Sequence, residues 1–203
     1  MEFQYYGKNT VTLAVKGRRF VIDANTFTKD KKSIFKNEDV ILFTEKNDPR
    51  FTLNNNLILD SPGEYEISDV SVNGIQSKHF KDQEPDVTMF KITTNELTVL
   101  ITGNINPDIN DTMLEKIGMI DLLIVPTGGF GHTLSPTDAL KVVKAIEPKV
   151  FIPTYYKNGS EDLYNIGDVV SQLGMEISEK TTKYKAKAND LSDKTQLVVL
   201  EIS

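Results

Sequence analysis

Short apolar and β-branched segments alternate with polar turns through about the first hundred residues of the chain. Runs of this length, bounded by glycine, asparagine and charged residues, are typical of β-strands. Two of them are joined by Lys16-Gly17-Arg18, which predicts a hairpin. We expect an antiparallel start that continues as a meander. The predicted strands are Phe3 to Tyr6, Val11 to Val15, Arg19 to Ile22, Val40 to Phe43, Leu57 to Leu59, Gly63 to Ile67, Val70 to Ile75, Val87 to Ile92 and Leu97 to Thr102.

The pattern changes after Gly103, where amphipathic segments alternate with continuous apolar runs typical of strands buried on both faces. Caps and apolar spacing predict helices over Thr112 to Ile117 with Asp111 as N-cap, from Ser135-Pro136 to near Pro148, and over a segment that includes Gly167 to Leu173 and ends at Gly174. The predicted strands of this half are Asp121 to Pro126, Val150 to Pro153 and a closing strand Gln196 to Ile202, with which Lys183 to Ala188 is expected to pair.

A strand-rich half followed by strand–helix alternation predicts an α+β fold in which two sheets pack face to face with helices outside, an αββα four-layer sandwich. We expect residues 1–203 to form a single domain, because single cores stop growing only beyond roughly 250 to 300 residues.

The amino-acid composition argues against several classes of function. The chain contains no cysteine, which excludes disulfides, thiolate nucleophiles and cysteine-held metals and favours a cytoplasmic location. A net charge of −6 opposes nucleic-acid binding, and the sequence lacks an apolar run long enough for a membrane span. These observations leave a small molecule or a protein as the partner, without naming either.

Several segments, taken in order, resemble the metallo-β-lactamase superfamily, nearest its small lactonase-like branch of metal-dependent hydrolases. In that family, histidines and carboxylates hold two zinc ions, so that bound water ionises near neutral pH and attacks a carbonyl or phosphoryl centre. The matching segments are Tyr6-Gly7 with a hairpin ending at Val21-Ile22-Asp23, Pro62 to Glu66, Gly103-Asn104, Asp121 to Gly129, Thr133 and Ile152 to Tyr156.

The resemblance also implies that most metal-binding residues of the family are replaced in this chain. It places the histidines and aspartate of the first metal motif on Glu45, Asn47, Pro49 and Arg50, the bridging aspartate on Asn104, the final histidine on Tyr155 and the lone third histidine near His79. Arg50 also brings a positive charge that repels a divalent cation. The resemblance therefore implies a degenerate metal site, and no cofactor is expected, although zinc or another divalent metal stays possible for a member of this family.

Other residues are candidates for cation binding, general-base catalysis, anion binding or substrate orientation. Glu45 and Asp48 are either ligands of a hard cation or solvated surface charges. His79 and His132 are the candidate general bases, each weighed against a structural role. Further candidates are Gly128, Gly129 and Gly131 with Arg50 for anion binding, Tyr155 and Tyr156 for orienting a substrate or closing the core, and Asp23 and Asn25 at a strand end near the expected cavity.

Three functions follow, and the residues leave open whether the protein is an enzyme. The first is a non-catalytic binding or scaffolding protein on a hydrolase fold that has lost its dinuclear zinc site. The second is a hydrolase of a phosphorylated or lactone-like small molecule with a rebuilt active site, in which His79, Asn104, His132 and Tyr155 converge. The third is a subunit of a larger assembly that uses the fold as an interface.

Overall fold

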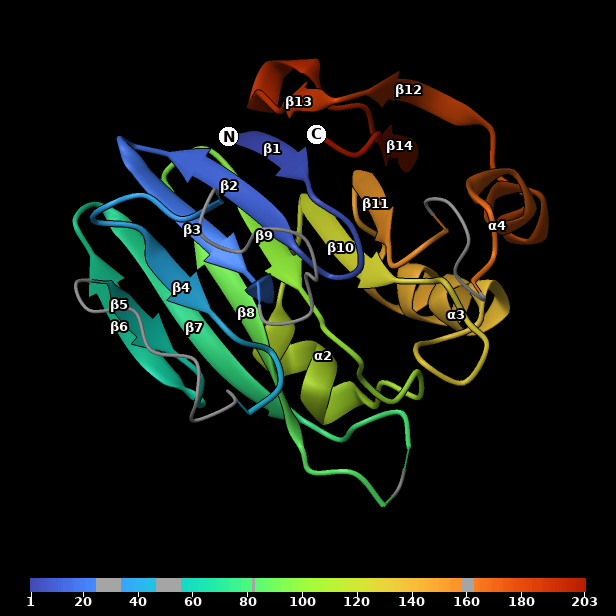
Figure 1. The fold of residues 1–203 in the computed structure, drawn as a ribbon, viewed down its shortest axis with the longest axis horizontal. Helices are drawn as coiled ribbons and strands as arrows, with labels where there is room; N and C mark the ends of the chain where they lie inside the picture. Colours follow the sequence, from blue (N-terminus) through green and yellow to red (C-terminus); the bar gives the residue numbers. More distant parts are fainter. Residues whose placement is uncertain (25–33, 47–55, 82, 158–162) are drawn as a thin grey trace.

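The strands of the protein form two sheets that pack face to face, with helices outside (Figure 1). The structure is a computed structural model, and it describes residues 1–24, 34–46, 56–81, 83–157 and 163–203. Within these residues one sheet has six strands and the other has eight.

The six-stranded sheet has the order β13-β1-β2-β3-β4-β5. Its strands are β1 (Glu2–Tyr5), β2 (Val11–Val15), β3 (Arg18–Ile22), β4 (Val40–Leu42), β5 (Leu57–Leu59) and β13 (Lys183–Lys185). The antiparallel start is confirmed for β1 to β3, but β4 and β5 run parallel to β3 and do not continue a meander. The long connections before β4 and β5 allow this, since parallel neighbours need a crossover and cannot be joined by a tight turn.

The prediction that Lys183 to Ala188 pairs with the closing strand was wrong, because β13 pairs antiparallel with β1. Cross-strand charges fit this register: Glu2 Oε1 lies 3.0 Å from Lys183 Nζ, and Glu2 Oε2 lies 3.5 Å from Lys185 Nζ. Between the two lysines, Tyr184 stacks on Phe3 with the ring centroids 6.4 Å apart. Opposite charges and aromatic pairs across strands stabilise this pairing.

The eight-stranded sheet has the order β12-β14-β11-β10-β9-β8-β7-β6. Its strands are β6 (Gly63–Ile67), β7 (Val70–Ser77), β8 (Val87–Thr93), β9 (Thr98–Ile101), β10 (Leu122–Pro126), β11 (Val150–Thr154), β12 (Ile177–Thr181) and β14 (Gln196–Leu200). The meander is confirmed for β6 to β9, and β10 and β11 are parallel and buried at every position, as their apolar runs predict. β12 was not predicted from the sequence, because it is an edge strand with mostly exposed residues.

The described helices are α2 (Asp111–Ile117), α3 (Pro136–Ile146), α4 (Ile166–Leu173) and the short 3-10 helix η2 (Ala188–Asp190). Ser135 caps α3 as predicted. The N-cap of α2 is Asn110 and not Asp111, because the Asn110 side chain accepts the Met113 N–H at 2.9 Å and Asp111 already lies in the first turn. None of the described helices is both long and apolar enough to span a bilayer.

Alternation along β3 and β4 separates two apolar clusters. Phe20, Ile22 and Leu42 belong to the main core between the sheets, whereas Val21 and Ile41 point to the opposite face of the six-stranded sheet. On that face they pack in a second cluster, which also contains Ala24, Ile34 and Phe43. Apolar packing on both faces of the sheet is what a layered sandwich requires. The predicted α+β, αββα fold is confirmed, while the single domain stays a prediction.

Candidate functional site

The carboxyl ends of the parallel strands meet at one edge of the sandwich, and the residues that follow them form the candidate site. Asp23 follows β3, and Thr44 and Glu45 follow β4, its parallel neighbour. Asn104 follows β9 in the other sheet. A backbone bond from Thr88 N to Thr44 O, 2.7 Å long, ties the two sheets together here.

Asp23 is almost fully buried and is held by Thr44. Its Oδ1 accepts the Thr44 N–H and its Oδ2 lies in hydrogen-bond contact with Thr44 Oγ1, each at 2.7 Å. Burial raises the pKa of the Asp23 carboxyl to about 7; the nearby Glu45 charge adds to this rise and the Thr44 hydrogen bonds oppose it. Asp23 is therefore a carboxyl group that changes its charge near neutral pH.

Glu45, Asn104 and His79 form a second polar group at the same edge. Asn104 Nδ2 donates to Glu45 Oε1 at 2.5 Å, and His79 Nε2 lies 3.8 Å from the same oxygen. His79 Nδ1 accepts the Lys81 N–H at 3.0 Å, so in neutral His79 the proton is on Nε2, facing Glu45. The structure thus gives His79 a carboxylate neighbour that the sequence could not assign.

The backbone locks His79 and Asn104 beside each other. His79 and Ile105 form an antiparallel bridge, and the Phe80 N–H donates to Asn104 O at 2.9 Å. Asn104 is buried, and its Oδ1 has no hydrogen-bond donor in the described part of the protein. A buried acceptor without a donor is uncommon in folded proteins, so the position of Asn104 calls for a functional or structural explanation.

Three residues at these strand ends have a left-handed backbone. Asp23 has φ +48° and Tyr155, directly after β11, has φ +61°. Gly103, with φ +64°, passes so close to Thr44 that an added Cβ would lie 2.4 Å from Thr44 Oγ1. Non-glycine residues in this conformation cost free energy and tend to occur at functional sites.

Tyr155, directly after β11, lies at the same edge. Its N–H donates to Lys8 O at 2.8 Å and to Tyr5 Oη at 3.0 Å, so the segment after β11 packs on the turn after β1. The neighbouring Tyr156 is buried and its hydroxyl donates to Leu200 O, which confirms the core role for Tyr156.

In the glycine turn after β10, the Gly129 N–H is already bonded to acceptors of the same turn. The Gly129 N–H bonds Leu134 O and Thr133 Oγ1, both at 3.0 Å, and Ser135 caps the following helix. Gly128 and Gly131 belong to the same turn, and anion binding by these glycines stays a prediction. His132 is exposed in this turn, and no hydrogen bond or ion pair among the described residues joins it to His79, Asn104 or Tyr155.

Several predicted site residues lie outside the described residues, namely Asn25, Asn47, Asp48, Pro49 and Arg50. Two buried polar residues near the site were not predicted from the sequence. Thr44 is the main partner of Asp23, and Asn9, in the turn before β2, is buried with its Oδ1 unpaired within the described part of the chain. Only the position of Thr44 directly after an apolar strand hinted at a role, and nothing marked Asn9.

Comparisons with known proteins agree on the family. A family model described as the β-lactamase superfamily domain matches residues 2–155, and the chain belongs to the metallo-β-lactamase superfamily. None of the curated proteins matches the sequence significantly.

Solved structures show the same fold along the whole chain. A Thermotoga maritima protein, assigned as a Zn-dependent hydrolase of this superfamily, is 21% identical with a TM-score of 0.77, over 100% of this chain and 99% of that one. A Parabacteroides distasonis protein, assigned as a metal-dependent hydrolase, is 15% identical with a TM-score of 0.65, over 99% and 93%. A metallo hydrolase of the archaeon Ignicoccus hospitalis is 13% identical with a TM-score of 0.64, over 100% and 95%.

The residues described at this edge do not fit the two zinc ions that the family implies. Zinc pairs need several imidazoles and carboxylates that converge. The described residues include no group of three or more His, Asp or Glu side chains placed to hold a metal. Glu45 Oε1 instead accepts a hydrogen bond from the Asn104 amide, a group that cannot replace an anionic ligand.

Asn104→Asp is expected to destabilise the protein by about 3 kcal/mol at neutral pH, because it places a second carboxylate, largely buried, against Glu45. Urea unfolding followed by circular dichroism measures the change. Asn106→Asp is the matched control, since Asn106 is only half-buried and its Oδ1 accepts the Asp108 N–H. Equal stability of the two variants would contradict the contact between Asn104 and Glu45.

Proposed function

We propose that this chain is a non-catalytic member of the metallo-β-lactamase superfamily, which has lost the dinuclear zinc centre and acts as a binding or scaffolding protein. One observation carries the proposal. Asn104, at the position that the resemblance gives to the metal-bridging aspartate, donates its amide N–H to Glu45. An N–H group at this place blocks a ligand position, because it directs a proton at the carboxylate where a metal ligand would offer a lone pair.

The surrounding contacts support the same proposal. Asp23 is bonded twice to Thr44, and His79 Nδ1 is occupied by the Lys81 N–H. Each of these bonds gives a polar group at the strand ends a protein partner that holds it in place. A fold maintained in this way offers a rigid surface for a ligand or a partner protein.

The second candidate is a hydrolase of a phosphorylated or lactone-like small molecule with a rebuilt active site. The pair of His79 and Glu45 favours it, since Nε2 and Oε1 are 3.8 Å apart and a carboxylate can orient a histidine. To act as general base, His79 Nδ1 would first have to release the Lys81 N–H that it accepts in this structure. His79 is buried and Glu45 is half-exposed, so a substrate would have to approach His79 from the side on which Glu45 reaches the surface.

The test is elemental analysis of the purified protein before and after incubation with Zn²⁺, Mn²⁺ and Mg²⁺, with a thermal melt for each ion. We expect far less than one equivalent of metal and no rise in melting temperature, because a stoichiometric ion would stabilise the folded state. One or two bound equivalents with a raised melting temperature would contradict the proposal.

The same preparation separates the two candidates. The metal-free protein is assayed with p-nitrophenyl phosphate and with γ-butyrolactone, and we expect no turnover above the blank. Turnover that persists in chelator and disappears in His79→Gln would instead establish the rebuilt hydrolase, because only the second candidate uses the His79 imidazole.

A further inference from the structure

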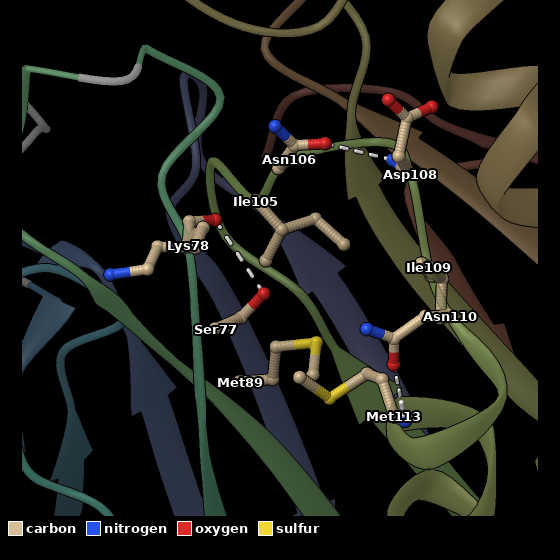
Figure 2. Close-up of a pocket in the computed structure, with 9 residues that line it drawn as sticks. All are labelled: Ser77, Lys78, Met89, Ile105, Asn106, Asp108, Ile109, Asn110 and Met113. Carbon is tan, nitrogen blue, oxygen red and sulfur yellow. Dashed lines mark hydrogen bonds between the residues drawn. The ribbon is translucent and has the colours of Figure 1, made fainter.

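A pocket of about 290 Å³ lies beside α2 (Figure 2). The ends of β7 and β8 and the segment between Asn104 and α2 surround it. Ile105 of its lining is the neighbour of Asn104 and forms an antiparallel bridge with His79, so the pocket lies next to the candidate site at the strand ends. None of its described lining residues is Glu45, Asn104 or His79. The volume equals on the order of ten water molecules, which is room for one small organic molecule.

The floor and one wall of the pocket are apolar. Met89 and Ile105 are buried beneath it, and Met113 and Ile109 are half-buried at its side. Figure 2 shows the Met89 and Met113 side chains next to each other, one from β8 and the other from α2. Two methionines form a soft and polarisable surface that adapts to ligands of different shape, aromatic rings in particular.

One amide group gives the pocket a fixed hydrogen-bond donor. Asn110 Oδ1 accepts the Met113 N–H at 2.9 Å, which fixes the orientation of the amide. Figure 2 shows the Asn110 nitrogen turned toward the pocket, and no described residue accepts a hydrogen bond from it. The oxygen of Asn106 is likewise engaged, by the Asp108 N–H at 2.9 Å, but its nitrogen points away from the pocket.

The charges around the pocket disfavour an anion. Lys78 Nζ lies 2.8 Å from Asp86 Oδ1 and points away from the pocket in Figure 2. Among the described lining residues, the one other charged side chain is that of Asp108, which is exposed. An anionic ligand would therefore be repelled by the Asp108 carboxylate, while the Lys78 ammonium is paired with Asp86 and directed away. A neutral ligand would not be repelled by this carboxylate.

We propose that this pocket binds a neutral small molecule, whose ring or apolar body lies on Met89, Met113 and Ile105 and whose carbonyl or hydroxyl oxygen accepts the Asn110 amide N–H. The site is independent of the proposed function of the strand ends, and it uses no residue of the Glu45, Asn104 and His79 group. It gives this protein a specific small-molecule ligand site on the helix-covered side of the eight-stranded sheet.

The test uses methionine methyl groups labelled with ¹³C, since the chain has only five methionines. Benzamide is titrated as the neutral probe, with benzoate as its anionic counterpart and benzylamine as a cationic probe without the carbonyl. We expect the Met89 and Met113 signals to shift saturably with benzamide, with a dissociation constant on the order of millimolar for so small a ligand. Met119, which is 94% exposed, and Met175 are internal controls.

The variant Asn110→Ser removes the amide donor and keeps a good helix cap. It is expected to weaken benzamide binding about fivefold, the contribution of one neutral hydrogen bond. Asn165→Ser changes the corresponding N-cap of α4, away from the pocket, and should leave binding unchanged.

Several outcomes would overturn the proposal. Equal shifts at Met119 and Met175 would mean unspecific association, and shifts of Met89 and Met113 that never saturate would mean that no site exists. Benzoate binding as tightly as benzamide would refute the preference for a neutral ligand. Unchanged binding in Asn110→Ser would refute the assigned donor.

Discussion

Gly128→Ala should abolish stable folding or cost about 4 kcal/mol or more of unfolding free energy. An alanine Cβ at this position would lie 1.6 Å from the Tyr155 carbonyl oxygen and 2.7 Å from its carbonyl carbon. Both are backbone atoms, and the Tyr155 N–H is bonded to Lys8 O, so the segment cannot move aside without breaking its contacts with the first turn of the chain. Urea unfolding followed by circular dichroism is the measurement, because the chain contains no tryptophan.

Gly131→Ala is the matched control in the same turn. Gly131 has φ +72°, but nothing lies within 4 Å of the added Cβ. The cost is therefore only that of a left-handed alanine, roughly 1 kcal/mol. If both variants were equally stable, the close approach of Gly128 to Tyr155 would be wrong.

Asp23→Asn should remove a large pH dependence of stability. The folded protein keeps the Asp23 proton until pH about 7, whereas the unfolded chain releases it near the ordinary pKa of 3.8. Between these values the folded state binds more protons, so the unfolding free energy falls as pH rises. At about 1.4 kcal/mol per unit of pKa, the wild type should lose roughly 3 kcal/mol relative to Asp23→Asn between about pH 5 and pH 8.

The measurement is the unfolding free energy of both proteins at several pH values, compared as a difference so that other titrating groups cancel. Asp69→Asn, at an exposed turn position, is the control and should give a curve parallel to that of the wild type. A constant difference between Asp23→Asn and the wild type across this range would show that burial does not shift the Asp23 pKa.

Most strands could be predicted from the sequence because burial controls their composition. The all-apolar runs of β10 and β11 are buried on both faces, and the fold class followed from their alternation with helices. β12 could not be found in this way, since its residues are mostly exposed and its pairing with β14 depends on the backbone. The partner of β13 was likewise hidden, because the cross-strand contacts with Glu2 come from the other end of the chain.

The candidate site was predictable only in part. Glu45, Asn104 and His79 were named through the family resemblance, and the structure places them in contact. The bonds between Asp23 and Thr44 depend on the parallel register of β3 and β4, which no local pattern specifies. A local pattern also could not show that the Asn104 oxygen would be buried without a donor.

The pairing of β1 with β13 also has a consequence for synthesis of the protein. Glu2 lies opposite Lys185, and Tyr5 bridges Ile202, so one edge of β1 acquires these neighbours only after the residues up to Lys185 and Ile202 have been made. At a ribosomal rate of about 5 to 20 residues per second, that edge stays open for on the order of ten to forty seconds. During this interval its unpaired N–H and C=O groups can pair with a strand of another nascent chain, and chaperone binding would be most useful then.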